Sequence, residues 1–259
     1  MKLPLYQVDA FTGRVFTGNP AAVVLLEEPL PGETMQKIAI ENNLSETAFV
    51  IPRGEAYPLR WFTPALEIDL CGHATLATAF VLFNERLAGT DEVRFDTKSG
   101  RLSVRQDGDL LKMDFPSRPP EPVEVSDLLV EALGTRPREA HLARDILALF
   151  DTPDEVAALA PKFHRFAELG AFAVMATARG SDVDFVSRFF APRAGVNEDP
   201  VTGSAHCTLV PFWAARLGKR VLHARQISRR GGELFCEDRG DRVTLGGRAV
   251  EYLRGEITI

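Results

Sequence analysis

The sequence repeats a short pattern at half its length. Residues 60–64 (RWFTP) match residues 188–192 (RFFAP) at the Arg, Phe and Pro positions, 128 residues apart in a chain of 259. An acidic, turn-rich stretch follows each copy, and then small residues that mark the start of a helix, Cys71–Ala74 in the first copy and Thr202–Ala205 in the second. Because self-similarity at a fixed spacing decides the architecture, the chain is predicted to form two related halves.

A proline-rich segment marks the boundary between the halves. Prolines stand at positions 116, 119, 120 and 122. Proline lacks a backbone N–H group and restricts φ, so neither a helix nor a central strand continues through this segment. We therefore predict an amino-terminal domain over residues 1–115, a linker over 116–122 and a carboxy-terminal domain over 123–259. The extreme C-terminal strand is a candidate to return to the first domain.

Both halves are predicted to be rich in short strands. Apolar and β-branched runs bounded by turn residues predict strands over residues 5–11, 21–26, 48–52, 59–62, 93–97, 102–106 and 110–115, and over 146–150, 172–178, 184–190, 226–229, 233–237, 242–245 and 251–259. Asp107-Gly108 predicts a tight hairpin, and Gly231-Gly232 predicts a turn. Short surface helices are expected over 126–133 and from Thr152, where a cap, a first-turn proline and an acid coincide.

The two repeat helices differ from these surface helices. Ala74–Phe83 is apolar on every side and Ala205–Ala215 is nearly so, as expected of a helix surrounded by protein. Pro211 is expected to kink the second helix. With short antiparallel strands around each helix, the sequence predicts an α+β fold with two pseudo-symmetric domains, each a curved sheet wrapped about one central helix.

Composition narrows the possible partners. The 30 Lys and Arg residues against 36 Asp and Glu residues give a net charge of -6 with no basic block, so no nucleic-acid partner is expected. The longest apolar stretch is too short to cross a bilayer, and the amino terminus does not resemble a signal peptide. Three cysteines without a CxxC pair indicate a reducing compartment, so a cytoplasmic location is expected.

Each repeat helix starts with a glycine, Gly72 or Gly203. A helix N-terminus exposes unpaired N–H groups and a partial positive charge, and glycine allows a ligand to approach the backbone closely. A single such site is better explained as a turn glycine. Two equivalent sites favour a function: if the halves bring both termini to one cleft, the cleft is predicted to bind a small anion, most naturally a carboxylate.

Titratable side chains cluster near both helix starts. They are Glu67, Asp69, Cys71 and His73 in the first copy, and Glu198, Asp199, Ser204, His206 and Cys207 in the second. Each has a structural explanation, because acids before helices act as caps and buried histidines pack in cores. The spacing matches no metal site, serine-nucleophile elbow or phosphate-binding glycine loop, so neither a metal nor a cofactor is predicted.

Acid–base chemistry remains as the function that these residue types favour. Carboxylates and a histidine beside helix termini that hold an acidic substrate meet the requirements for moving a proton on carbon. Glu46, directly before an apolar strand, is a further candidate. Its structural alternative is a solvated strand end.

Five motifs resemble the phenazine-biosynthesis isomerase (PhzF-like) family. They are Asp9–Thr12 (DAFT), Gly18–Ala21 (GNPA), Ser45–Thr47 (SET), Asp69–Thr75 (DLCGHAT) and Asp199–Ala205 (DPVTGSA). They occur in the family's order and cover most of the chain. The resemblance implies a diaminopimelate-epimerase-like fold, in which two pseudo-symmetric domains each form a barrel of mostly antiparallel strands around a central helix. It also implies an active site between the domains and a homodimer.

The resemblance implies a reaction and a role for each site residue. The reaction is a cofactor-free isomerisation of a dihydro-hydroxyanthranilate, in which Glu46 takes a proton from carbon and returns it at another position. The remaining catalytic residues would be His73, Asp199 and Ser204, and the substrate-binding residues Gly72, Gly203, Asn19 and Asp69. Because a solvated carboxylate is a weak base, Glu46 is predicted to be largely buried and to face the helix starts.

Two alternative functions remain open. The superfamily's epimerases use two facing thiols, and here Cys71 occupies the first position while Thr202 occupies the second, with Cys207 about one turn further on. An amino- or hydroxy-acid epimerase predicts deuterium incorporation at one stereocentre and sensitivity to alkylation of Cys71. A metabolite-binding protein on the same scaffold predicts that Glu46→Gln leaves ligand affinity nearly intact and that there is no turnover.

Overall fold

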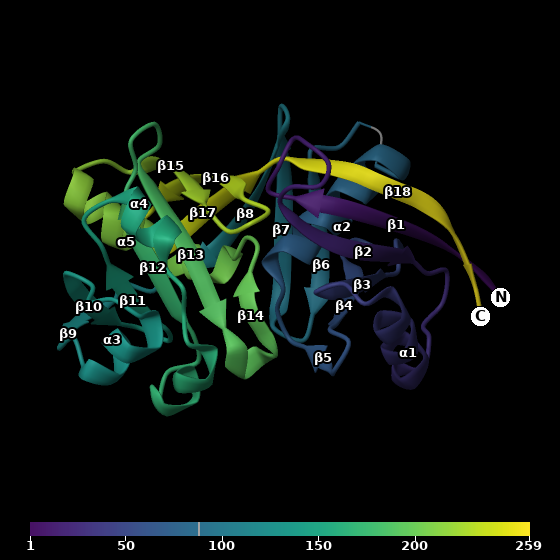
Figure 1. Cartoon of the computed structure of the whole chain (residues 1–259). Helices are drawn as coiled ribbons and strands as arrows, with labels where there is room; N and C mark the ends of the chain where they lie inside the picture. The colour runs from purple at the N-terminus through teal and green to yellow at the C-terminus, as the bar shows by residue number, and fades with distance from the viewer. Residues whose placement is uncertain (88) are drawn as a thin grey trace. The chain divides into compact units, whose positions relative to one another are not determined.

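The computed structural model describes residues 1–87 and 89–259 and shows a mixed α/β chain with a large sheet (Figure 1). The chain divides into two compact units. Unit 1 contains Met1–Asp114 together with Gly246–Ile259, and unit 2 contains Phe115–Leu245. Among the described residues, no helix has the length and apolar character needed to cross a membrane.

Unit 1 combines two helices with most of the amino-terminal strands. Its elements are β1 (Lys2–Ala10), β2 (Asn19–Leu25), α1 (Gly32–Asn42), β3 (Glu46–Val50), β4 (Tyr57–Phe62), β5 (Glu67–Ile68), α2 (Gly72–Glu85), β6 (Glu92–Thr97), β7 (Gly100–Asp107) and β18 (Ala249–Thr258). Strand β8 (Leu110–Pro116) spans the end of this segment. The C-terminal strand β18 pairs antiparallel with β1 from Lys2↔Thr258 to Ala10↔Ala249, so both chain ends belong to unit 1.

Unit 2 contains the remaining elements. They are β9 (Glu121–Val123), α3 (Asp127–Leu133), β10 (Glu139–Leu142), β11 (Ile146–Leu149), α4 (Pro153–Ala158), the 3₁₀ helix η1 (Phe163–Glu168), β12 (Val174–Arg179), β13 (Phe185–Ala191), the 3₁₀ helix η2 (Pro192–Ala194), β14 (Val196–Asp199), α5 (Gly203–Leu217), β15 (Val221–Gln226), β16 (Gly232–Asp238) and β17 (Arg242–Gly247).

The two units have the same strand connectivity. In unit 1, β2 and β3 are parallel, and β4 pairs antiparallel with β3 and β5 and parallel with β6. In unit 2, β11 and β12 are parallel, and β13 pairs antiparallel with β12 and β14 and parallel with β15. α2 follows β5, and α5 follows β14. Each repeat helix therefore begins after the same strand of its unit.

Equivalent arginines form bidentate ion pairs in both copies of the repeat. Arg60 donates from Nε and Nη2 to the two carboxylate oxygens of Glu67 at 2.7 and 2.9 Å, and Arg188 makes the same two contacts with Glu198 at 2.7 and 2.9 Å. Each guanidinium also lies over the phenylalanine ring two residues further along, at 5.1 and 5.0 Å. Two of the acids near the helix starts are thus partners of arginines that link neighbouring strands.

Both repeat helices are buried over most of their length, to Leu82 in α2 and Ala214 in α5, which confirms the prediction from their apolar sequences. In α2 the polar positions Thr75 and Thr78 are satisfied locally, because their hydroxyls donate to the carbonyls of Cys71 and Ala74. α2 packs against β1, β2, β3 and β18, and α5 packs against β15 and β16. α5 is one helix that continues through Pro211.

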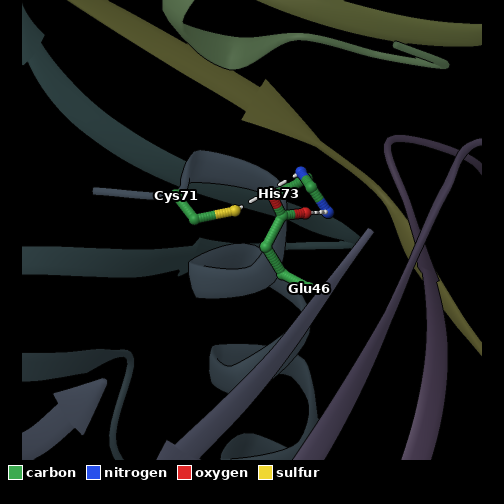
Figure 2. A group of neighbouring side chains, drawn as sticks. All are labelled: Glu46, Cys71 and His73. Atoms are coloured by element: carbon green, nitrogen blue, oxygen red, sulfur yellow. Dashed lines mark hydrogen bonds and ion pairs between the residues drawn. The ribbon is translucent and has the colours of Figure 1, made fainter. Parts of the chain in front are cut away.

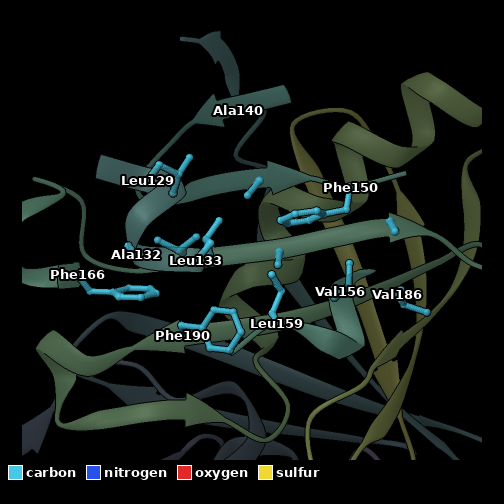
Figure 3. Packing of buried hydrophobic residues seen from close by; sticks show 14 of the residues in the cluster. Leu129, Ala132, Leu133, Ala140, Phe150, Val156, Leu159, Phe166, Val186 and Phe190 are labelled. Carbon is cyan, nitrogen blue, oxygen red and sulfur yellow. The ribbon is translucent and has the colours of Figure 1, made fainter. Parts of the chain in front are cut away.

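Separate clusters of apolar side chains hold the peripheral helices. In unit 1, Met35 and Ile38 of α1 pack with Phe49 and Phe62 of the sheet. In unit 2, side chains of α3, α4 and η1 pack against β12 and β13 in a larger apolar cluster (Figure 3). Its members include Leu129, Leu133, Val156, Phe166 and Phe190.

The caps of α3 and α4 match the sequence prediction. Ser126 accepts from the Leu129 N–H, and Thr152 and Glu155 form a reciprocal capping box.

Most predicted strands are confirmed, with small shifts at their ends. The hairpin at Asp107-Gly108 is present, since Asp107 pairs with Leu110 and Gly108 has φ +62°. The strand predicted over 226–229 is wrong, because β15 ends at Gln226 and the following residues form the turn to β16. The sequence also missed α1, β5, β10, β14, β15 and the short β9, which begins at the end of the proline-rich segment and pairs with β10.

Candidate functional site

The edge of the sheet in unit 1 brings together residues that are far apart in the sequence. Asn19 and Glu46 are the first residues of β2 and β3. These strands are parallel with Ala21 opposite Glu46, so both begin at the same edge of the sheet. α2 packs against both strands. His73, in the first turn of α2, therefore lies beside the side chains of Asn19 and Glu46.

Cys71, His73 and Glu46 form a continuous chain of contacts (Figure 2). The Sγ atom of Cys71 lies 3.5 Å from Nδ1 of His73, and Nε2 of His73 lies 3.0 Å from Oε2 of Glu46 in an ion pair. Nδ2 of Asn19 lies 3.2 Å from Nδ1 of His73. Only 6% of the His73 side chain and 15% of the Glu46 side chain are exposed. The imidazole is thus held between a thiol and a carboxylate, with little access to water.

Burial and charge set the protonation states of this cluster. Burial raises the pKa of the Cys71 thiol, and the neighbouring Glu46 carboxylate raises it further. Burial alone would lower the pKa of His73, but the acidic groups of Cys71 and Glu46 outweigh it and raise the pKa well above 6.5. The raised pKa of His73 favours an imidazolium, and the raised pKa of Cys71 favours a neutral thiol.

The start of α2 adds a positive end of a helix dipole to this cluster. Cys71 is the N-cap residue and makes no side-chain capping hydrogen bond, and Gly72 is the first helical residue. The first-turn N–H groups of α2 are therefore not capped by the N-cap side chain. Asp69 lies just before this turn, where it is exposed and its backbone carbonyl accepts from Ser99. No contact between described residues joins its carboxylate to Glu46 or His73.

In unit 2, a buried glutamine holds the turn before α5. Thr202 donates from Oγ1 to Oδ2 of Asp199 at 2.5 Å. Gln226 is fully buried, accepts from the Thr202 N–H at 2.9 Å, and donates to the Asp199 carbonyl at 2.7 Å and to Oγ1 of Thr202 at 3.2 Å. These bonds fix the position from which Gly203 starts the helix. Sequence reasoning missed Gln226, because a lone glutamine at the end of a strand has no motif.

Arg144 brings a positive charge to the second helix start. Its Nη2 lies 3.4 Å from Oγ of Ser204, and the guanidinium pairs with Asp145 and lies 5.1 Å from the centre of the Phe172 ring. The ion pair and the ring hold the guanidinium beside the helix start. Sequence reasoning missed Arg144 as well, since 60 residues separate it from Ser204.

His206 and Cys207 have structural roles, as their alternative interpretation held. His206 is fully buried and donates from Nδ1 to the Thr202 carbonyl at 2.8 Å, and burial lowers its pKa to about 4. Burial raises the pKa of Cys207 to about 11, and its thiol contacts the Gly203 carbonyl. A neutral imidazole and a neutral thiol are therefore expected at these positions at neutral pH.

The structure thus gathers the predicted residues into two local groups. Asn19, Glu46 and His73 meet in unit 1, together with Cys71. Asp199, Gly203 and Ser204 share one turn in unit 2. One potential ligand atom from each of Glu46, Cys71 and His73 also lies within 4.8 Å of the other two, a spacing that suits a metal ion.

Comparison with known proteins agrees with this fold. The family model described as phenazine biosynthesis-like protein matches residues 8–255. An uncharacterized isomerase of Pseudomonas aeruginosa is 52% identical over 257 residues, which cover 99% of each chain. The crystal structure of a PhzF-family phenazine biosynthesis protein from Enterococcus faecalis is 48% identical and superposes with a TM-score of 0.98 over 100% of each chain.

A more distant structure relates the fold to another group of enzymes. A hydroxyproline epimerase from Agrobacterium vitis matches with a TM-score of 0.64 at 13% identity, over 99% of this chain and 92% of that one. The fold is therefore shared by phenazine biosynthesis-like proteins and by an epimerase. The chain belongs to the phenazine biosynthesis-like (PhzC–PhzF) family, as its motifs predict.

Proposed function

We propose that the protein is a cofactor-independent isomerase that moves a proton between carbon atoms of a small carboxylate substrate, with Glu46 as the general acid/base. The reaction class resembles that of trans-2,3-dihydro-3-hydroxyanthranilate isomerase. The observation that carries the proposal is the largely buried Glu46 carboxylate, 3.0 Å from Nε2 of His73 at the start of α2. The name of the similar P. aeruginosa protein, an uncharacterized isomerase, supports the same class.

In this proposal Glu46 and His73 work as a pair. The His73 imidazole lies 3.0 Å from the Glu46 carboxylate and orients it, and Glu46 would accept the proton from carbon. The C–H bond breaks, the proton moves to Glu46, and the electron pair delocalises into the conjugated substrate. The same carboxylic acid then donates the proton to another carbon atom, so atoms and charge balance. Burial strengthens the charge interactions that stabilise the intermediate.

The proposal assigns substrate binding to the helix starts. By the family resemblance, the N–H groups at Gly72 and at Gly203 are assigned to substrate binding, as helix N-termini bind anions in other proteins. Asn19 and Asp69 would bind the substrate, and Asp199 and Ser204 would orient it and shuttle protons. Arg144, 3.4 Å from Ser204, adds a cation that favours an acidic substrate.

The finer architecture belongs to the proposal as well. By the family resemblance, each unit is a barrel of mostly antiparallel strands around α2 or α5, and the protein acts as a homodimer in the cytoplasm. The three cysteines are free thiols, which agrees with a reducing compartment.

One observation favours a second candidate, an epimerase or racemase of an amino or hydroxy acid. The Cys71 thiol lies at the N-cap of α2, 3.5 Å from the His73 imidazole, so a sulfur that can carry a proton stands beside the helix terminus. The corresponding residue of the second repeat is Thr202, whose hydroxyl is engaged by Asp199. An epimerase would therefore need a non-thiol partner for Cys71, which ranks this candidate second.

Deuterium uptake from heavy water tests the proposal across a panel of candidate substrates. Carboxylate metabolites are incubated with wild type, Glu46→Gln and Glu67→Gln, and exchange is followed by mass spectrometry and NMR. We expect Glu46→Gln to lower the exchange rate by about 10²–10⁴-fold, the usual contribution of a positioned acid/base. Glu67→Gln is the matched control, because Glu67 is also a shielded carboxylate of unit 1 but pairs with Arg60.

The outcomes of this exchange assay distinguish the candidate functions. Exchange that persists in Glu46→Gln refutes the role of Glu46. Exchange at one stereocentre that Cys71→Ala abolishes identifies an epimerase. Saturable binding of a carboxylate with no exchange in wild type identifies a binding protein.

A further inference from the structure

The Glu46–Cys71–His73 cluster has the donor set of a zinc site. Sulfur, imidazole nitrogen and carboxylate oxygen are the three protein ligands that Zn²⁺ prefers. One such atom from each residue lies within 4.8 Å of the others, and all three side chains are largely shielded from water (Figure 2). No other group of three His, Cys, Asp or Glu side chains with this spacing occurs among residues 1–87 and 89–259.

The spacing of two donors already matches tetrahedral coordination. Zn–S bonds of about 2.3 Å and Zn–N bonds of about 2.0 Å at a tetrahedral angle place sulfur and nitrogen about 3.5 Å apart. Sγ of Cys71 and Nδ1 of His73 are 3.5 Å apart. Glu46 contacts the other ring nitrogen, Nε2, at 3.0 Å, so coordination through Nδ1 requires its side chain to rotate, and a ligand atom of Glu46 already lies within 4.8 Å of those of Cys71 and His73.

We propose that Cys71, His73 and Glu46 bind one Zn²⁺ ion through Sγ, Nδ1 and a carboxylate oxygen, and that the bound ion inhibits the protein. Binding releases the protons of the thiol and of Nδ1 to solvent, while water occupies the fourth position. Sequence spacing predicts no metal site, because it considers only ligands that lie close together in the chain. Glu46 joins Cys71 and His73 only through the parallel pairing of β2 and β3.

Inhibition follows from the loss of both proton carriers. A carboxylate bound to zinc no longer accepts a proton from carbon, and a metal-bound imidazole no longer pairs with that carboxylate. This consequence rests on the proposed function, but the metal site itself does not. Hard cations such as Mg²⁺ are not expected to compete, because they prefer oxygen ligands.

A direct titration tests the site. Reduced, chelator-treated wild type is titrated with Zn²⁺ against a chromophoric chelator, and separately with Co²⁺ to detect a thiolate-to-cobalt charge-transfer band. We expect one ion per chain, and a band that Cys71→Ser abolishes together with at least a 100-fold loss of zinc affinity. Cys236→Ser is the matched control, because Cys236 is also a buried free thiol, and it retains affinity and band.

His73→Gln provides a second variant in case Cys71→Ser fails to fold, as judged by circular dichroism. The proposal is overturned if wild type binds no stoichiometric zinc, if either site variant binds like wild type, or if Cys236→Ser loses affinity equally. Zinc binding without proton exchange on any substrate refutes the proposed function and leaves the metal site standing. Proton exchange on a substrate that continues when zinc saturates the Cys71 site refutes the inhibition by zinc.

Discussion

Replacement of Arg188 by Met is expected to destabilise the protein far more than the same replacement of Arg60. The two arginines make equivalent bidentate pairs, but Arg188 is 12% exposed and Arg60 is 39% exposed. Arg188 also donates from Nη1 to three backbone carbonyls at the C-terminal end of α4, at 2.9–3.2 Å. Glu67, the partner of Arg60, also forms an ion pair with Lys98 at 2.6 Å, so it would still have a cationic partner after the loss of Arg60.

These differences set the expected magnitudes. Loss of one member of a buried ion pair costs about 3–5 kcal/mol, because the remaining charge stays buried without a partner. Glu198 is 22% exposed, so we expect about 4 kcal/mol for Arg188→Met, including the loss of the carbonyl contacts. Arg60 itself is 39% exposed and Glu67 also pairs with Lys98, so the loss of Arg60 is expected to cost about 1 kcal/mol in Arg60→Met, near the upper end for solvent-accessible pairs.

Equilibrium urea unfolding of wild type and both variants, followed by circular dichroism, measures the difference. At about 2–4 °C per kcal/mol, thermal midpoints are expected to fall by about 10 °C for Arg188→Met and about 3 °C for Arg60→Met. Equal losses of stability, or a larger loss for Arg60→Met, would show that burial and the carbonyl contacts do not distinguish the two copies.

Two further predictions concern protonation and backbone conformation. The pKa of His73, raised above 6.5 by its acidic neighbours against the effect of burial, is expected to fall in Glu46→Gln, as measured by NMR titration of the imidazole. Because the pKa of His73 is raised in the folded state, His73 adds stability that is complete below pH 6.5 and is lost as the pH rises through the folded-state pKa. An unchanged His73 pKa in Glu46→Gln would show that Glu46 does not raise it. Gly18→Ala is expected to cost about 3 kcal/mol or more, since Gly18 has φ +69° and an added Cβ would lie 2.3 Å from the Ala10 carbonyl oxygen. Gly218→Ala, at φ +64° with no atom within 4 Å of the added Cβ, is expected to cost about 1 kcal/mol in the same urea assay, and equal costs would refute the steric argument.

Local rules explain the elements that the sequence predicted well. The hairpin at Asp107-Gly108 and the caps at Ser126 and Thr152 depend on residues no more than a few positions apart. The buried character of α2 and α5 follows from apolar residues on all sides of each helix. Such features are determined by short stretches of chain, and a short stretch is sufficient to predict them.

The elements that were missed lack such local signals. α1 begins after Pro31 without a side-chain cap, and its stability comes from packing of Met35 and Ile38 against the sheet. The sequence pattern places a strand over residues 226–229 and misses β15, which ends where that predicted strand begins. Short strands such as β14 exist only because a neighbouring strand pairs with them.

For the candidate site, the sequence identified the residue types and the structure decided how they act. The motifs single out Glu46 and His73 without indicating that they touch, and the contributions of Gln226 and Arg144 arise from chain segments that meet only after folding. The two buried histidines near the helix starts illustrate the limit. The pKa of His73 is raised by Cys71 and Glu46, whereas burial lowers that of His206 to about 4.

Periodicity, capping and residue type are properties of neighbouring residues, so the duplicated architecture, the apolar helices and the set of groups that can carry protons follow from the amino-acid sequence. Which of these groups is charged and which is inert depends on how the chain folds. The energy of a proton on a side chain depends on the charges and the water around it, and parallel strands and helix packing bring those surroundings together from distant parts of the chain.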